Sequence, residues 1–90
     1  MSEATKLDHG QITIAGGENA VPGLGVSSIA LKSLASNVGD VYIGEAGFAG
    51  ASDGYPISPG ESIALDLQDS AQLKLRGTTG DKVAYIITKP

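Results

Sequence analysis

Side chains that could perform catalysis are scarce in this 90-residue sequence. Nucleophilic catalysis needs a Ser, Cys or Thr beside a base, and the chain has one histidine and no cysteine. His9 lies in a polar N-terminal segment, where we expect it to be solvated rather than oriented by neighbours. Gly60, Glu61 and Ser62 match part of a Gly-x-Ser-x-Gly nucleophile elbow, but the second glycine is missing and no helix is expected to follow. The sequence therefore predicts no catalytic residue, and we expect a protein that is not an enzyme.

Two glycine-rich stretches match phosphate-binding loops only in part. Gly23 and Gly25 fall one glycine short of a dinucleotide-binding fingerprint and lack its strand–helix context. Gly44, Gly47 and Gly50 have the wrong spacing for a phosphate loop, and no Lys-Ser/Thr pair follows them. Loops that need backbone freedom explain both stretches. We therefore expect no cofactor.

Carboxylates are the remaining candidates for chemistry, because several fall at expected turns and could converge in space. They are Asp40, Glu45, Asp53, Asp66, Asp69 and Asp81. None follows the spacing of an EF-hand, and turn and cap roles explain them more simply. Their spacing does not exclude a glycosidase pair, but four aromatic residues and no Trp offer little surface on which a sugar could stack. We expect no metal site.

The charge and hydropathy of the chain exclude two classes of partner. A net charge of −4 and a sequence pI of about 4.6 argue against nucleic acid, which requires a basic stripe. No apolar run is long enough to span a bilayer. The N-terminal residues also lack the basic and apolar regions of a secretory signal. We therefore expect a protein that is made in the cytoplasm, or one from which a signal has been removed.

Gly and Pro divide the chain into short segments of alternating hydrophobicity, which is the pattern of an all-β domain. Residues 26–35 are the least certain of these segments, because their Ala and Leu content also allows one or two helical turns. About seven strands at roughly ten-residue spacing, each with one buried face, predict a compact antiparallel β-sandwich or small barrel. The expected strands lie within residues 11–15, 20–21, 26–35, 40–44, 61–67, 72–77 and 82–88.

The length predicts one domain with a small core. We expect residues 1–9 to form a mobile N-terminal arm and residues 10–90 to form a single β domain. Eleven of the apolar residues are alanine, so burial barely offsets the conformational entropy lost on folding. Oligomerisation is one way to stabilise such a chain.

One loop is a candidate partner surface. Residues 44–54 are rich in glycine, and they carry an apolar side chain, Phe48, on what we expect to be a mobile segment. Tyr42 and Tyr55 lie on either side of this loop and could flank it. We predict a partner interface made by these three residues; the alternative is that Phe48 folds back as a plug of the core.

Three stretches of the sequence resemble a pattern found in small proteins of tailed bacteriophages and prophages. They are residues 35–44 (ASNVGDVYIG), 53–67 (DGYPISPGESIALDL) and 80–86 (GDKVAYI). The resemblance covers roughly residues 26–87. The family usually has Asn-Gly before Tyr-Pro, whereas this chain has Asp53 and Gly54, and both pairs tolerate the same turn.

The resemblance implies a structural role in the virion. We expect a capsid decoration protein, made in the host cytoplasm, that forms a homo-oligomer and docks on the major capsid protein or another virion protein. A trimer is favoured if it occupies a capsid three-fold position. Two alternatives remain open: an adhesin or carbohydrate-binding module, such as a head fibre or tail accessory protein that binds host glycans, and a small enzyme or calcium-binding domain.

Overall fold

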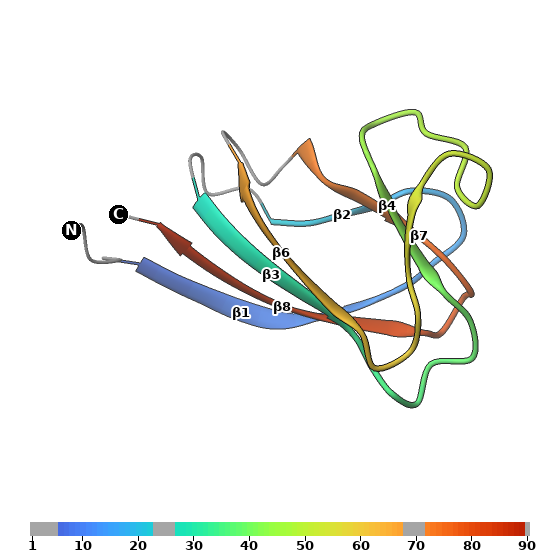
Figure 1. The fold of residues 1–90 in the computed structure, drawn as a ribbon, viewed down its shortest axis with the longest axis horizontal. Coiled ribbons are helices and arrows are strands. Elements are labelled where there is room, and N and C mark those ends of the chain that lie inside the picture. Colours follow the sequence, from blue (N-terminus) through green and yellow to red (C-terminus); the bar gives the residue numbers. More distant parts are fainter. Residues whose placement is uncertain (1–5, 23–26, 68–71, 90) are drawn as a thin grey trace.

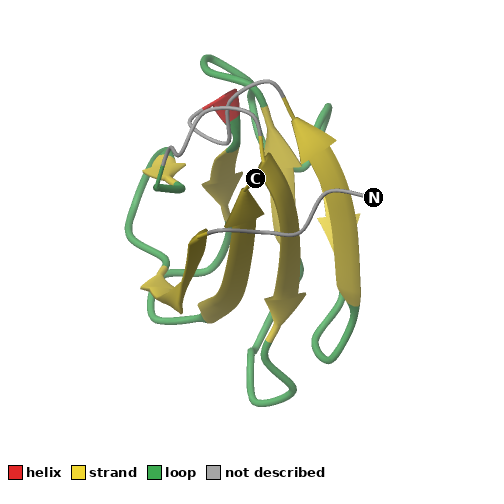
Figure 2. Ribbon diagram, turned by 90° about the vertical axis from the view of Figure 1, so that its left-hand side faces the viewer, coloured by secondary structure: helices red, strands yellow, loops and turns green. Residues whose placement is uncertain are grey.

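The protein is a sandwich of two four-stranded antiparallel sheets in a computed structural model that describes residues 6–22, 27–67 and 72–89. Sheet A has the strand order β1-β8-β3-β6, and sheet B has the order β2-β7-β4-β5 (Figure 1). Strands and loops make up nearly all of the described chain (Figure 2). The strands are β1 (Lys6–Thr13), β2 (Asn19–Ala20), β3 (Ser27–Ser33), β4 (Val41–Gly44), β5 (Tyr55–Ile57), β6 (Ser62–Leu67), β7 (Lys74–Arg76) and β8 (Lys82–Lys89).

The predicted all-β antiparallel sandwich is confirmed, with eight strands in the described part of the chain instead of about seven. The additional strand is β5, which pairs with β4 at the edge of sheet B. Pro56 lies in the middle of β5. Because proline cannot donate a hydrogen bond to a sheet, an edge strand is where it is tolerated.

The core lies between the two sheets and is made by the alternate residues that the sequence pattern places inward. Sheet A contributes Ile29 and Leu31 from β3 and Val83 and Ile87 from β8, each at most 2 % exposed. The buried hydrophobic residues of the whole cluster are Ile14, Val21, Ile29, Leu31, Val41, Ile43, Ile57, Leu73, Leu75, Val83 and Ile87. Alternate residues of the strands therefore face the core, as alternation predicts, although those of β1 and β6 are only partly buried.

Residues 27–33 form strand β3 and not a helix. This strand lies in the interior of sheet A, where it pairs with β6 on one side and with β8 on the other. Hydrogen bonds on both edges and the burial of Ile29 and Leu31 exceed the weak helical propensity of the segment, because tertiary context readily overrides propensity.

Strand β1 begins at Lys6, within the segment that we expected to form an arm. Residues 6–9 pair with the last four residues of β8, from Lys6 opposite Lys89 to His9 opposite Ile86. Since β8 extends to Lys89, it offers backbone partners that the polar composition of residues 6–9 does not indicate. Residues 1–5 lie outside the described part of the chain.

Two turns form at positions where Gly and Pro divide the sequence. Gly60 has a φ of 87°, and the Glu61 amide donates to the Ser58 carbonyl at 2.9 Å, as in a type II turn with Pro59 at the second position. The turn before β2 is held by Asn19, whose side chain accepts from the Ala15 amide at 2.9 Å and donates to the Ala15 carbonyl at 3.1 Å. The turn expected at Asp69 and Ser70 lies outside the described residues.

Candidate interaction surface

Residues 37–39 and residues 81–82 are joined by hydrogen bonds between side chains and backbone. Asn37 accepts from the Lys82 amide at 2.8 Å and donates to the Lys82 carbonyl at 2.7 Å. In return, the Asp81 carboxylate accepts from the amides of Val38 and Gly39 at 2.9 and 3.0 Å. Asp81 is 5 % exposed, so its side chain is committed to this contact. These motifs join the loop before β4 to the start of β8, which is a structural function.

The loop between β4 and β5 folds over the outer face of sheet B. Phe48 is 7 % exposed, and its ring lies so close to Gly44 and Gly54 that a Cβ atom at either glycine would overlap it. The Asp53 carboxylate accepts from the amides of Ala49 and Gly50 at 2.9 and 3.1 Å. Phe48 is thus buried, as in the alternative that we considered, but its ring covers the outside of sheet B and is not a plug of the core between the sheets.

The two tyrosines of the predicted interface lie on different faces of sheet B. Tyr42 lies on the outer face near Phe48, since the Cβ of Tyr42 and the Phe48 ring both approach Gly54. Tyr55 is paired with Ile43, so it shares the inward-facing register of that residue, but it lies on the edge strand and is 60 % exposed. The structure therefore brings Tyr42 and Phe48 together and leaves Tyr55 apart. An interface through these residues stays a prediction.

The outer face of sheet A is a broader candidate surface. Its side chains form rows that cross all four strands, because the registers of the three strand pairs align. The central row contains His9, Ile86, Ala30 and Ala64. The row before it contains Leu7, Thr88, Ser28 and Asp66, and the row after it contains Gln11, Ala84, Lys32 and Ser62.

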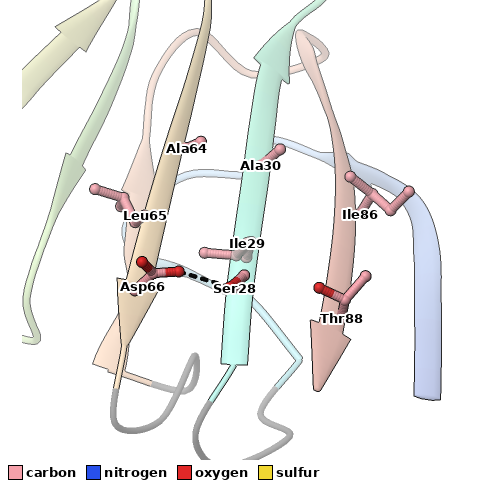
Figure 3. A pocket seen from close by; sticks show the side chains of 8 residues that line it. All are labelled: Ser28, Ile29, Ala30, Ala64, Leu65, Asp66, Ile86 and Thr88. Carbon is pink, nitrogen blue, oxygen red and sulfur yellow. Dashed lines mark hydrogen bonds between the residues drawn. The ribbon is translucent and has the colours of Figure 1, made fainter. Parts of the chain in front are cut away.

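Small side chains dominate the middle of this face. Ala30 and Ala64 lie side by side on β3 and β6, and Ile86 lies on the adjoining strand β8 (Figure 3). Part of the face is an open groove of about 230 Å³ that these residues line together with Ser28, Asp66 and Thr88. Ile86 is 44 % exposed and Leu7 is 60 % exposed. The solvated face of a sheet is usually polar, so an apolar centre is a surface suited to a partner.

The charged residues of the same face are separated along the strands. Asp66 lies in the first row, where its carboxylate accepts from the Ser28 hydroxyl at 2.6 Å (Figure 3). Lys32 lies in the third row and on the neighbouring strand, four residues along β3 from Ser28. The strand rise of about 3.3 Å per residue puts these rows about 13 Å apart. The apolar centre thus has an acidic corner and a basic end, which could orient a partner.

Two other features, a metal cluster and a membrane-spanning helix, have no support in the described residues. Across residues 6–22, 27–67 and 72–89, no three His, Asp or Glu side chains lie close enough together to hold a metal ion. Within the same ranges, the structure has no helix of the length and apolarity that a membrane span requires.

The comparison with solved structures gives one relevant similarity. The chain is similar to a de novo designed double-stranded β-helix solved by NMR, with a TM-score of 0.54 and 16 % sequence identity over 96 % of this chain and 100 % of the designed one. At this identity the similarity establishes the fold alone. No protein-family model and no curated protein sequence matches the chain.

Sequence reasoning did not identify the outer face of sheet A as a surface. The signal was present in the alternation: the outward positions of β3, β6 and β8 include Ala30, Ala64, Ala84 and Ile86, where long polar side chains are usual on a solvated sheet face. However, only the strand order shows that these positions lie next to one another.

Proposed function

We propose that the protein is a non-enzymatic structural component of a tailed-bacteriophage virion, in which it acts as a capsid decoration protein. In this function it associates with copies of itself and docks on the major capsid protein. The resemblance of residues 26–87 to small phage proteins supports the virion assignment. The observation that supports self-association is the outer face of sheet A, whose central row exposes Ile86 beside Ala30 and Ala64.

The construction of the chain is consistent with this proposal. The phage-like motifs are used for backbone contacts, as the bonds of Asn37 and Asp81 show. A 90-residue domain without disulfides gains stability from neighbours, because subunit association shifts the folding equilibrium by mass action.

The assembly part is tested by substitution on the outer face of sheet A. Light scattering after size-exclusion chromatography should give an oligomer for the wild-type protein and a smaller species for Ile86→Lys, because a buried lysine would remain unpaired in the interface. Val38→Lys is the matched control, since Val38 is 85 % exposed on a loop and receives the same change of charge. A strict monomer at high concentration would contradict self-association.

The virion part requires a separate experiment. Mass spectrometry of purified particles of a phage that encodes this protein should detect it in many copies per particle. Particles that form normally and contain none of it would refute the assignment, whatever the oligomeric state of the isolated protein.

A further inference from the structure

The single arginine of the chain, Arg76, lies on the outer face of sheet B. It follows the buried Leu75 and is paired with Tyr42, so both side chains point away from the core. The guanidinium carbon lies 5.6 Å from the centroid of the Phe48 ring, within the range of a cation–π contact. The side-chain stem passes beside Gly50, where an added Cβ would lie 3.3 Å from the Arg76 Cδ. Phe48 and Gly50 therefore fix the position of the guanidinium.

Arg76 has no polar partner among the described residues. Its Nε is buried and makes no hydrogen bond, and no carboxylate of the described chain forms an ion pair with the guanidinium. This is unexpected in a protein with ten acidic and six basic residues. A partly buried charge without a hydrogen-bonding partner is destabilising, and stacking on a ring offsets only part of that cost. Since Nε is out of reach of a ligand, a partner from outside the chain would bind the terminal Nη groups, where Arg76 borders open space.

An open depression of about 390 Å³ lies beside Arg76. Its lining includes Tyr42, Asp40 and Thr78, and it also includes four glycines, Gly17, Gly39, Gly50 and Gly77. A Cβ at Gly39 would lie 2.8 Å from the Thr78 hydroxyl oxygen, so the absence of side chains there keeps the space open. The volume lies at the lower end of the range for small-molecule sites, which is roughly 300–1,000 Å³.

The polar residues around the depression favour a carboxylate ligand over a phosphate. A guanidinium fork binds carboxylate or phosphate through paired hydrogen bonds. Asp40 lines the same depression, and its negative charge would repel a doubly charged phosphate more strongly than a singly charged carboxylate. Asp40 is also an acceptor for ligand hydroxyl groups, and the hydroxyls of Tyr42 and Thr78 can both donate and accept.

We infer that this depression binds a hydroxylated monocarboxylate of monosaccharide size, that is, an acidic sugar residue, with Arg76 on the carboxylate and Asp40 on a hydroxyl group. The inference is independent of the proposed assembly function, because it uses the outer face of sheet B and not that of sheet A. Recognition rests on charge and hydrogen bonding, so it does not require the aromatic stacking surface that this chain lacks.

A titration followed by NMR tests the inference on the intact protein. Because the chain has one arginine, its Nε–Hε group gives one side-chain resonance. Glucuronic acid and N-acetylneuraminic acid are the two probes, and at least one should shift this resonance saturably, together with the amides of Gly50 and Gly77. Glucose and inorganic phosphate should give weaker changes at equal concentration. A flat response to both acids would overturn the inference, and so would an equal affinity for acetate, since acetate lacks hydroxyl groups.

Variants identify the residue responsible. Arg76→Gln should lower the affinity for the acidic sugar at least about tenfold, the loss expected for a charge-assisted pair. Lys74→Gln is the matched control, because Lys74 lies on the same face of β7 and loses the same charge, and it should bind normally. Unchanged binding by a folded Arg76→Gln protein would overturn the inference. If the Arg76→Gln protein does not fold, the titration of the wild-type protein still tests whether the acidic sugar binds.

Discussion

Replacing Asp81 with asparagine tests the contact that joins the loop before β4 to the start of β8. The two carboxylate oxygens of Asp81 accept from the amides of Val38 and Gly39 at 2.9 and 3.0 Å. Asparagine supplies one oxygen and one NH₂ group, so one of these amides faces a donor instead of an acceptor. The other amide keeps a neutral hydrogen bond, which is weaker than a bond to a carboxylate.

The expected loss follows from the cost of an unsatisfied donor. Leaving a buried N–H without an acceptor costs about 1–3 kcal/mol, and because these amides are only partly buried we expect a loss of about 2 kcal/mol. A 90-residue domain has a total stability of roughly 5–13 kcal/mol at about 0.05–0.15 kcal/mol per residue. The melting temperature should then fall by roughly 8–16 °C, at about 4–8 °C per kcal/mol.

Denaturation and hydrogen exchange measure this change. Far-UV circular dichroism gives the melting temperature and the free energy of unfolding, and NMR gives the exchange rates of the Val38 and Gly39 amides, which should rise more than those of the sheet. Glu45→Gln is the matched control, because Glu45 is exposed and its side chain accepts no hydrogen bond in the described structure. If Asp81→Asn were as stable as this control, the structural function assigned to the motifs would be refuted.

Two further substitutions test the packing. Gly44→Ala should destabilise the protein by about 1–3 kcal/mol in chemical denaturation, because the new Cβ displaces the Phe48 ring. Gly16→Ala is the control and should change the stability little, because the space around its Cβ is open. Equal effects of the two substitutions would contradict the contact between Gly44 and Phe48. Leu31→Ala should lower the free energy of unfolding by about 2–5 kcal/mol, because Leu31 is 1 % exposed in the core. Val38→Ala is the exposed control. A loss below about 1 kcal/mol for Leu31→Ala would be inconsistent with the burial of Leu31.

The alternation of apolar residues was sufficient to predict most of the core. The inward placement of Val41 and Ile43, and of Val83 and Ile87, follows from a period of two, because successive side chains of a strand point to opposite faces. Local turn chemistry was equally informative at Pro59 and Gly60, since a positive φ at the third position of the turn favours glycine. These features depend on residues that are neighbours in the sequence, so they can be predicted from the sequence.

The ends of the sheet were less predictable. Residues 6–9 have a polar composition, and they form part of β1 only because β8 provides a backbone partner. The composition of residues 27–33 allows either a strand or helical turns, and pairing with β6 and β8 favours the strand. Hydrogen bonds between strands distant in sequence are properties of the pairing and not of either segment.

By itself, the sequence of this protein determined the all-β class, the inward residues, the turns and the scarcity of catalytic side chains. The tertiary structure alone decided which outward residues share a surface. Ala30, Ala64 and Ile86 come from three strands and become one face through the order of sheet A. Arg76 and Phe48 meet because a ten-residue loop folds back over sheet B. Surfaces are made by residues far apart in the chain, and only packing places them together.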